Sequence, residues 1–268
     1  MERFDEWSDL PALECAVTER RFTYTDIRAM ARRFGSELLR QGLRPGDKIG
    51  TMVPNCPEFG PILLGSLGVG VTVVPISPLL TSPEVSRILN IARPKLVITA
   101  DPLIPLLSQE VKDQVSLWIG IILGKIKKKI LQTEIISVTE GSEKAGRLSE
   151  FLSNDGTGYD SRPSFDVRET LGILPFSSGT TGPPKGVMLT NQNLTASIYQ
   201  ANNRDSGCSL NPHLPGQEEQ PRGLSVIPMF HIFGLVFNVL QPLSVGAHTV
   251  IMPKFESASF IARFVNKQ

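Results

Sequence analysis

The sequence predicts an α/β fold in which mostly parallel sheets are flanked by helices. Short apolar runs typical of buried strands occur at residues 48–53, 71–75 and 96–99. Helical patterns lie between these runs, and short turns separate the two kinds of pattern. Alternation of this kind is typical of a parallel α/β sheet. The sequence contains no internal repeat that would predict a solenoid or a propeller instead.

Three helices are expected in the first hundred residues. The first should begin after Thr25 as its N-cap, because apolar side chains recur with a period of 3.6 over residues 27–39. Gly42 stands where a C-terminal glycine belongs. The second helix is expected over residues 58–70, and Ser82 is expected to cap the third.

Further elements follow from the same patterns. Strands are expected at residues 12–17, 21–24, 134–138, 171–176, 223–227 and 248–252. Helices are expected over 148–152 and 190–201, the second with Thr190 as its N-cap. The polar stretches 154–167 and 204–222 are expected to be surface connections.

Composition excludes several classes of function. The formal net charge of +1 over 268 residues gives no reason to expect nucleic acid or an acidic membrane as a partner. The longest apolar run, residues 115–123, is too short for a transmembrane segment. The lysine-rich run at residues 125–130 favours a solvated face over a phosphate or lipid site.

The cysteines indicate a reducing compartment such as the cytoplasm. Cys15, Cys56 and Cys208 lie far apart without a CxxC pair, so neither a disulfide framework nor a zinc site is predicted. The polar, acidic start of the chain is not a signal peptide.

The stretch with the clearest chemistry is Ser-Ser-Gly-Thr-Thr-Gly-Pro-Pro-Lys-Gly at residues 177–186. Its glycines let backbone N–H groups approach phosphate oxygens, its hydroxyls add donors, and Lys185 supplies a point charge. A Walker A loop is excluded, because Pro184 precedes the lysine and Gly186 follows it. The alternative is a Ser/Gly-rich surface loop without function.

This block resembles the AMP-binding signature of adenylate-forming enzymes: acyl-CoA synthetases, luciferases and peptide-synthetase adenylation domains. With Leu-Pro-Phe before it and Val-Met-Leu-Thr after it, it is most similar to the 4-coumarate–CoA ligase branch. Three earlier blocks are also similar to this family: residues 23–27, 42–49 and 54–59.

The resemblance implies an ATP-dependent acid–thiol ligase that activates a carboxylic acid through an acyl-adenylate. ATP, Mg²⁺ and CoA are the implied cofactors, and a small carboxylic acid is the implied substrate. Residues 1–268 are expected to be the N-terminal part of the large AMP-binding domain, truncated before the C-terminal lid domain. The alternative is a truncated or vestigial fragment that binds a ligand or partner without catalysis. The resemblance also leaves a peroxisomal location open for a longer form with a C-terminal signal.

The resemblance assigns phosphate-binding roles within the signature block, and Mg²⁺ would bridge oxygens of ATP. The phosphate-binding residues are Ser177, Ser178, Gly179, Thr180, Thr181, Gly182 and Lys185. Lys185 is also expected to be catalytic, because its charge would stabilise the reacting phosphates.

A second candidate segment, Pro228–Leu235, follows the strand at 223–227, and ligands collect at the carboxyl ends of such strands. By itself, His231 among aromatic residues is either a packed or gating residue or a catalytic one. The resemblance implies that it orients the acyl carboxylate and lines the CoA channel. Phe233 stands in the substrate site where many coumarate-type members have a tyrosine. Lys254 is either a CoA contact by resemblance or a solvated lysine at a strand end.

Asp47 and Asn55 are two polar residues near predicted turns. Each lies beside glycine or proline, which favours hydrogen bonding within turns over a binding site.

Overall fold

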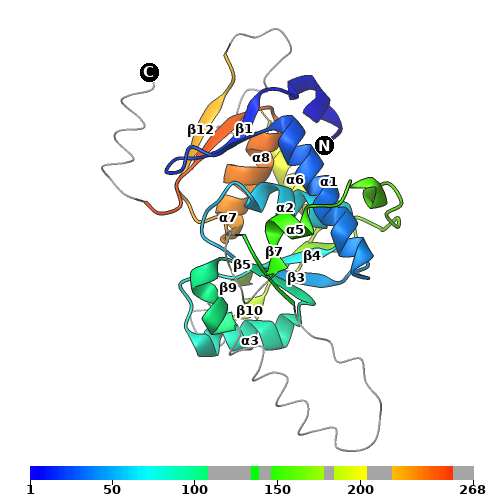
Figure 1. The fold of residues 1–268 in the computed structure, drawn as a ribbon, viewed down its shortest axis with the longest axis vertical. Coiled ribbons are helices and arrows are strands. Elements are labelled where there is room, and N and C mark those ends of the chain that lie inside the picture. The colour runs from blue at the N-terminus through cyan, green and yellow to red at the C-terminus, as the bar shows by residue number, and fades with distance from the viewer. Residues whose placement is uncertain (108–133, 139–145, 178–183, 204–218, 256–268) are drawn as a thin grey trace, which may run out of the picture.

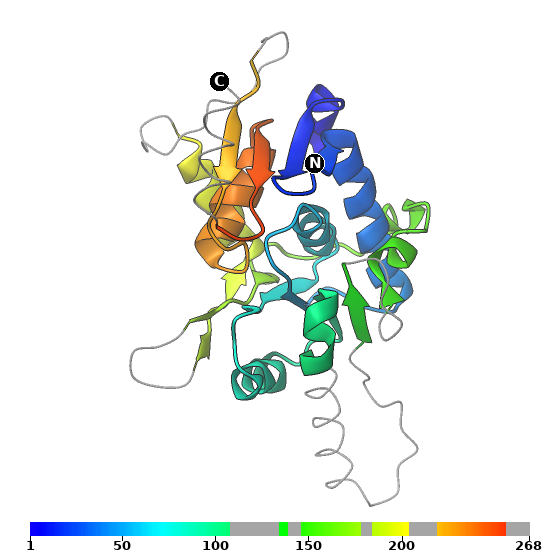
Figure 2. The ribbon, with the colours of Figure 1, turned by 60° about the vertical axis from the view of Figure 1, so that its left-hand side comes forward.

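The computed structural model describes residues 1–107, 134–138, 146–177, 184–203 and 219–255. Within these residues the strands form a seven-stranded sheet, a four-stranded sheet and a two-stranded pair (Figure 1). Helices lie between the two larger sheets and on the outer face of the seven-stranded one (Figure 2). The predicted fold class is therefore confirmed.

The seven-stranded sheet has the order β11-β8-β4-β3-β5-β6-β7. Its strands are β3 (Lys48–Met52), β4 (Thr72–Pro75), β5 (Leu96–Thr99), β6 (Glu134–Ser137), β7 (Gly146–Arg147), β8 (Leu171–Ile173) and β11 (Leu189–Thr190). All neighbours are parallel except β11, which runs antiparallel to β8. Successive residues of β4 pack into the two hydrophobic cores on opposite faces of the sheet, Val73 into one and Val74 into the other. Burial of both faces explains why these strands are continuous apolar runs.

Helices cover both faces of this sheet. On the inner face lie α1 (Tyr24–Arg40), α2 (Phe59–Gly68), the short α5 (Leu148–Phe151) and α6 (Asn191–Ala201). On the outer face lies α3 (Ser82–Ala92). None of the described helices is long and apolar enough to cross a membrane.

The four-stranded sheet has the order β12-β13-β1-β2 and covers the other side of the helix layer. Its strands are β1 (Pro11–Cys15), β2 (Arg21–Thr23), β12 (Arg222–Ser225) and β13 (His248–Ile251). Only β2 is antiparallel to its neighbour. The buried Glu14 carboxylate accepts from Arg21 Nε at 2.9 Å and lies 3.2 Å from His248 Nε2, so one buried charge meets partners on two neighbouring strands.

The N-terminus of α1 differs from the sequence prediction. Its N-cap is Thr23 rather than Thr25. Asp26 N donates to the Thr23 hydroxyl at 3.2 Å, and the Asp26 carboxylate accepts from Thr23 N at 2.9 Å. Thr25 Oγ1 instead donates to the Ser8 carbonyl oxygen. The reciprocal threonine–aspartate pair therefore decides where the helix begins.

The same reason corrects the start of α3. Thr81, not Ser82, is its N-cap, because the Glu84 carboxylate accepts from Thr81 N at 2.8 Å. The prediction for α6 is confirmed: Thr190 is its N-cap and pairs reciprocally with Asn193.

Two further differences concern the candidate site. The strand expected at 171–176 is divided into β8 and β9 (Phe176–Ser177), because Pro175 has no N–H to continue the ladder. A helical run that the sequence did not predict follows β12. It consists of α7 (Ile232–Leu235), the π-helix η5 (Val236–Leu240) and α8 (Gln241–Ser244).

Candidate functional site

The two ends of the signature block pair with each other just beyond the carboxyl end of β8. β9 pairs antiparallel with β10 (Lys185–Gly186), and this pairing places Lys185 opposite Ser177. The other predicted phosphate contacts, Ser178, Gly179, Thr180, Thr181 and Gly182, lie outside the described residues. The structure thus brings the two ends of the predicted phosphate loop together.

Lys185 is exposed at the base of this loop. Among the described residues, no carboxylate lies within ion-pair distance of its Nζ. Behind it, an added Cβ on Gly186 would lie 3.2 Å from Leu174 Cδ1, so this strand pair is seated on apolar side chains. An exposed ammonium beside a serine hydroxyl is suited to an anionic ligand.

His231 lies on a tight turn after β12. Its N–H donates to the Pro228 carbonyl oxygen at 3.1 Å, and its exposed side chain caps α7. Nδ1 accepts from Phe233 N at 3.3 Å. Because Nδ1 is the acceptor, a neutral ring carries its proton on Nε2 and can donate there. The alternative of a packed core histidine is wrong, since the side chain is exposed.

The turn is closed by Gly234. An added Cβ at this position would lie 2.1 Å from the Pro228 carbonyl oxygen, so no larger residue fits without moving the backbone. Phe233 is 49% exposed, and its ring centroid lies 4.6 Å from that of Phe237. The turn therefore presents a polar imidazole beside an exposed aromatic surface.

Lys254 lies at the same edge of the four-stranded sheet as His231. β12 and β13 are parallel neighbours with Ser225 opposite Ile251, and each candidate residue follows the carboxyl end of one of them. Lys254 is exposed. Lys185 belongs to the other sheet, and within the described part of the chain no hydrogen bond or ion pair joins it to His231. The predicted residues therefore form two groups rather than one connected cluster.

Sequence reasoning misjudged Asn55. Its side chain is buried rather than confined to a turn, and it donates to the carbonyl oxygens of Ile227 and Met252 at 3.1 and 3.2 Å. Its Oδ1 accepts from Met229 N at 2.7 Å. Asp47 does make the expected turn hydrogen bond, because its carboxylate accepts from Arg44 N at 2.8 Å, and it also forms an ion pair with Lys95 Nζ at 2.6 Å.

The residue after Asn55, Cys56, lacks the lowered pKa of a reactive cysteine. Burial, followed by the negative charge of Glu58, raises the pKa of Cys56 above the ordinary range of a cysteine. A raised pKa disfavours the thiolate, which is the form of cysteine that acts as a nucleophile or metal ligand. Glu58 itself is ion-paired with Arg20.

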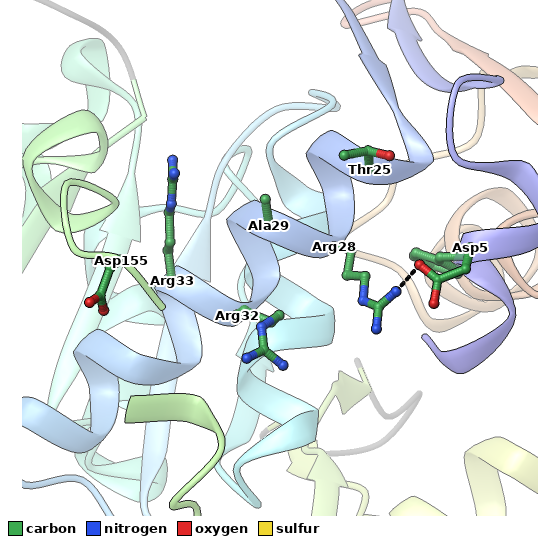
Figure 3. A pocket seen from close by; sticks show the side chains of 8 residues that line it. Asp5, Thr25, Arg28, Ala29, Arg32, Arg33 and Asp155 are labelled. Carbon is green, nitrogen blue, oxygen red and sulfur yellow. Dashed lines mark hydrogen bonds and ion pairs between the residues drawn. The ribbon is translucent and has the colours of Figure 1, made fainter. Parts of the chain in front are cut away.

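A cavity of about 300 Å³ lies along α1 (Figure 3), and none of its lining residues is a predicted site residue. It is lined by Phe4, Asp5, Thr25, Arg28, Ala29, Arg32, Arg33 and Asp155. Two of its three arginines are ion-paired: Arg28 pairs with Asp5, and Arg32 donates to Asp160. Arg33, which also lines the cavity, is exposed and has no ion pair among the residues that the structure describes.

The sequence and the fold agree with known proteins. A family model described as AMP-binding enzyme matches residues 2–268. The chain belongs to the AMP-binding enzyme family. The resemblance inferred from residues 177–186 is thereby confirmed.

This AMP-binding chain is similar to longer proteins. It is 31% identical over 265 residues to a 4-coumarate–CoA ligase of Vanilla planifolia, covering 97% of this chain and 43% of the ligase. A red-emitting luciferase of Phrixothrix hirtus has a TM-score of 0.81 at 22% identity, covering 99% of this chain and 47% of that one. The N-terminal domain of FACL13 from Mycobacterium tuberculosis has a TM-score of 0.75 at 26% identity, covering 99% and 59%. These coverages are those expected of an N-terminal portion of such an enzyme.

Proposed function

We propose that this chain is part of an ATP-dependent ligase that converts a carboxylic acid to an acyl-adenylate and transfers the acyl group to CoA. Family membership and the similarity to a 4-coumarate–CoA ligase support this proposal. The observation that carries it is the exposed Lys185 opposite Ser177 at the base of the signature loop. Residues 1–268 would form part of the large AMP-binding domain, and the C-terminal lid domain would be supplied by sequence outside them.

In the adenylation step, a carboxylate oxygen of the acid attacks the α-phosphorus of ATP, and the bond to pyrophosphate breaks. Negative charge accumulates on the departing β- and γ-phosphates. Lys185, as the catalytic cation, would stabilise this charge, together with donors from the loop. The loop donors are Ser177, Ser178, Gly179, Thr180, Thr181 and Gly182.

Mg²⁺ would be carried on the triphosphate. No group of three or more His, Cys, Asp or Glu side chains suited to a metal ion occurs among the residues described by the structure. Oxygen ligands from ATP match the preference of Mg²⁺, which commonly keeps few protein ligands.

His231 would orient the acid as the second catalytic residue. With Nδ1 held by Phe233 N, its Nε2–H is the group available to donate to a carboxylate oxygen. Phe233 would contribute an apolar wall without a hydroxyl, which favours acids that need no hydrogen-bond partner there. Lys254, exposed at the same sheet edge, would contact a phosphate of CoA.

Acid-dependent exchange of pyrophosphate into ATP tests the adenylation step. Lys185→Met is expected to lower the exchange rate about 10²- to 10³-fold with little change in the KM for the acid, because the charge acts on the departing phosphates. Lys185→Arg keeps the charge and is the matched control, expected to retain more of the rate. Equal exchange by Lys185→Met and the parent would contradict the role of Lys185.

The mass of the native polypeptide decides which chain to assay. If the native product is longer, the pyrophosphate-exchange assay should be done on that longer protein. If the native product is the 268-residue chain and it binds ATP without exchange, the ligand-binding fragment would replace the ligase as the functional interpretation.

A further inference from the structure

Asn55 connects three parts of the chain that are distant in sequence. It lies between β3 and α2 and is only 6% exposed. Its contacts with Ile227 and Met252 span 172 and 197 residues, and its contact with Met229 spans 174.

These contacts hold the ends of two parallel strands. The carbonyl groups of Ile227 and Met252 lie just beyond β12 and β13, and the two amide hydrogens of Asn55 are used on them. Asn238 also donates to the Ile227 oxygen, at 3.2 Å, from the π-helix. A buried carboxamide with its donors occupied is held in one orientation, because rotation would leave buried polar groups unpaired.

The third contact reaches the turn that carries His231. Met229 N donates to Asn55 Oδ1 at 2.7 Å, two residues before the histidine. The far side of the turn is fixed by Gly234, which leaves no room between itself and the Pro228 carbonyl. The His231 ring is exposed, and among the described residues its one hydrogen bond is from Phe233 N to Nδ1, so its direction depends on this backbone.

We propose that Asn55 is a positioning residue that sets the orientation of His231 through the turn at residues 227–231. The functional part of this inference rests on the proposed role of His231 in orienting the acid. The structural part, that Asn55 sets the orientation of the His231 ring, does not rest on that role and can be measured without catalysis.

The first measurement is ¹⁵N NMR of the histidine rings. The sequence contains three histidines, so His231→Gln identifies the signals of His231. In the parent at a pH where the ring is neutral, Nδ1 should show the shift of an unprotonated nitrogen and Nε2 that of a protonated one. Asn55→Ala is expected to abolish this separation by mixing the two tautomers and to speed hydrogen exchange at Met229 N.

Asn154→Ala is the matched control. Asn154 also donates to two carbonyl oxygens, of Arg33 and Phe151, and accepts from Gly156 N at 2.9 Å. These contacts lie on α1 and beside α5, so its replacement should leave the His231 signals unchanged. A folded Asn55→Ala protein with the parental tautomer would overturn the proposal, and so would an equal change in Asn154→Ala.

Asn55→Asp replaces the alanine variant if that one does not fold, because it keeps the oxygen that accepts from Met229 N and loses donors to the carbonyls. If both Asn55 variants unfold while Asn154→Ala folds, Asn55 is a determinant of the whole fold and the positioning role is refuted.

Kinetics separate this inference from the proposed function. In a chain that catalyses exchange, Asn55→Ala should raise the KM for the acid and lower kcat while the KM for ATP stays unchanged. Altered His231 signals with unaltered acid kinetics would support the positioning role and contradict the role of His231 in the reaction.

Discussion

Replacing Gly65 with alanine is expected to force α1 and α2 apart. The added Cβ would lie 2.5 Å from the Ala31 carbonyl oxygen and 3.1 Å from Gly35 N, whereas ordinary contacts begin at 3.4 Å. Both neighbours are backbone atoms of α1, so no rotamer change can make room. Overpacking costs about 1–3 kcal/mol, and the better helix propensity of alanine returns about 0.5–1 kcal/mol. At the middle of both ranges, the free energy of unfolding should therefore fall by roughly 1 kcal/mol.

Urea denaturation followed by circular dichroism measures this change as a lower midpoint at unchanged slope. Gly60→Ala in the same helix is the matched control. Its Cβ would also meet an atom at 2.5 Å, but that atom is Leu13 Cδ1, the end of a side chain. The loss should be smaller there. The reasoning is refuted if Gly65→Ala is as stable as the parent, or if Gly60→Ala costs as much.

Two further predictions concern a buried hydroxyl and a helix cap. Tyr24→Phe removes the hydroxyl that donates to the Ala247 carbonyl oxygen at 2.8 Å, so the free energy of unfolding should fall by about 1–3 kcal/mol. Tyr199→Phe is the control, because Tyr199 is 79% exposed and its replacement should leave stability unchanged. Equal urea midpoints for the two variants would contradict this prediction. Hydrogen bonds from the hydroxyl and the backbone N–H of Thr81 lower the pKa of Glu84 in the folded protein. The ionised carboxylate therefore stabilises the fold at a pH above the unfolded-state pKa of Glu84, about 4.3. This stabilisation is lost as the pH falls through the lower pKa of the folded state. The melting temperature of Glu84→Gln should therefore fall less than that of the parent between about pH 5 and pH 3. Parallel curves of melting temperature against pH would contradict the proposed role of Glu84 in the cap.

The elements that could be predicted from the sequence are those whose signal is local. β5 was expected at residues 96–99 and occupies them, because a strand buried on both faces is a short apolar run. The first residue of a helix could not be predicted in the same way, because it depends on which side chain caps the helix. Thr23 and Thr25 are equally suitable caps by residue type, and only the reciprocal bond from Asp26 distinguishes them.

The candidate site also has a local signal. The composition of residues 177–186 favours an anion-binding loop, and the pairing of Ser177 with Lys185 brings the two ends of this stretch together. Asn55 was not predictable, since its partners follow 172 to 197 residues later and no spacing rule joins them. The π-helix at residues 236–240 was missed because an apolar run of that length has no distinctive period.

The pairing of β1 with β13 has a consequence for synthesis of the chain. Tyr24 and Ala247, joined by a hydrogen bond beside this pairing, are 223 residues apart. At about 5–20 residues per second, a ribosome needs roughly 10–45 s to make the intervening chain. During that time the seven-stranded sheet can assemble, while the side of the helix layer that β13 will cover stays open. The nascent protein is therefore expected to engage chaperones most strongly just before residue 251 emerges.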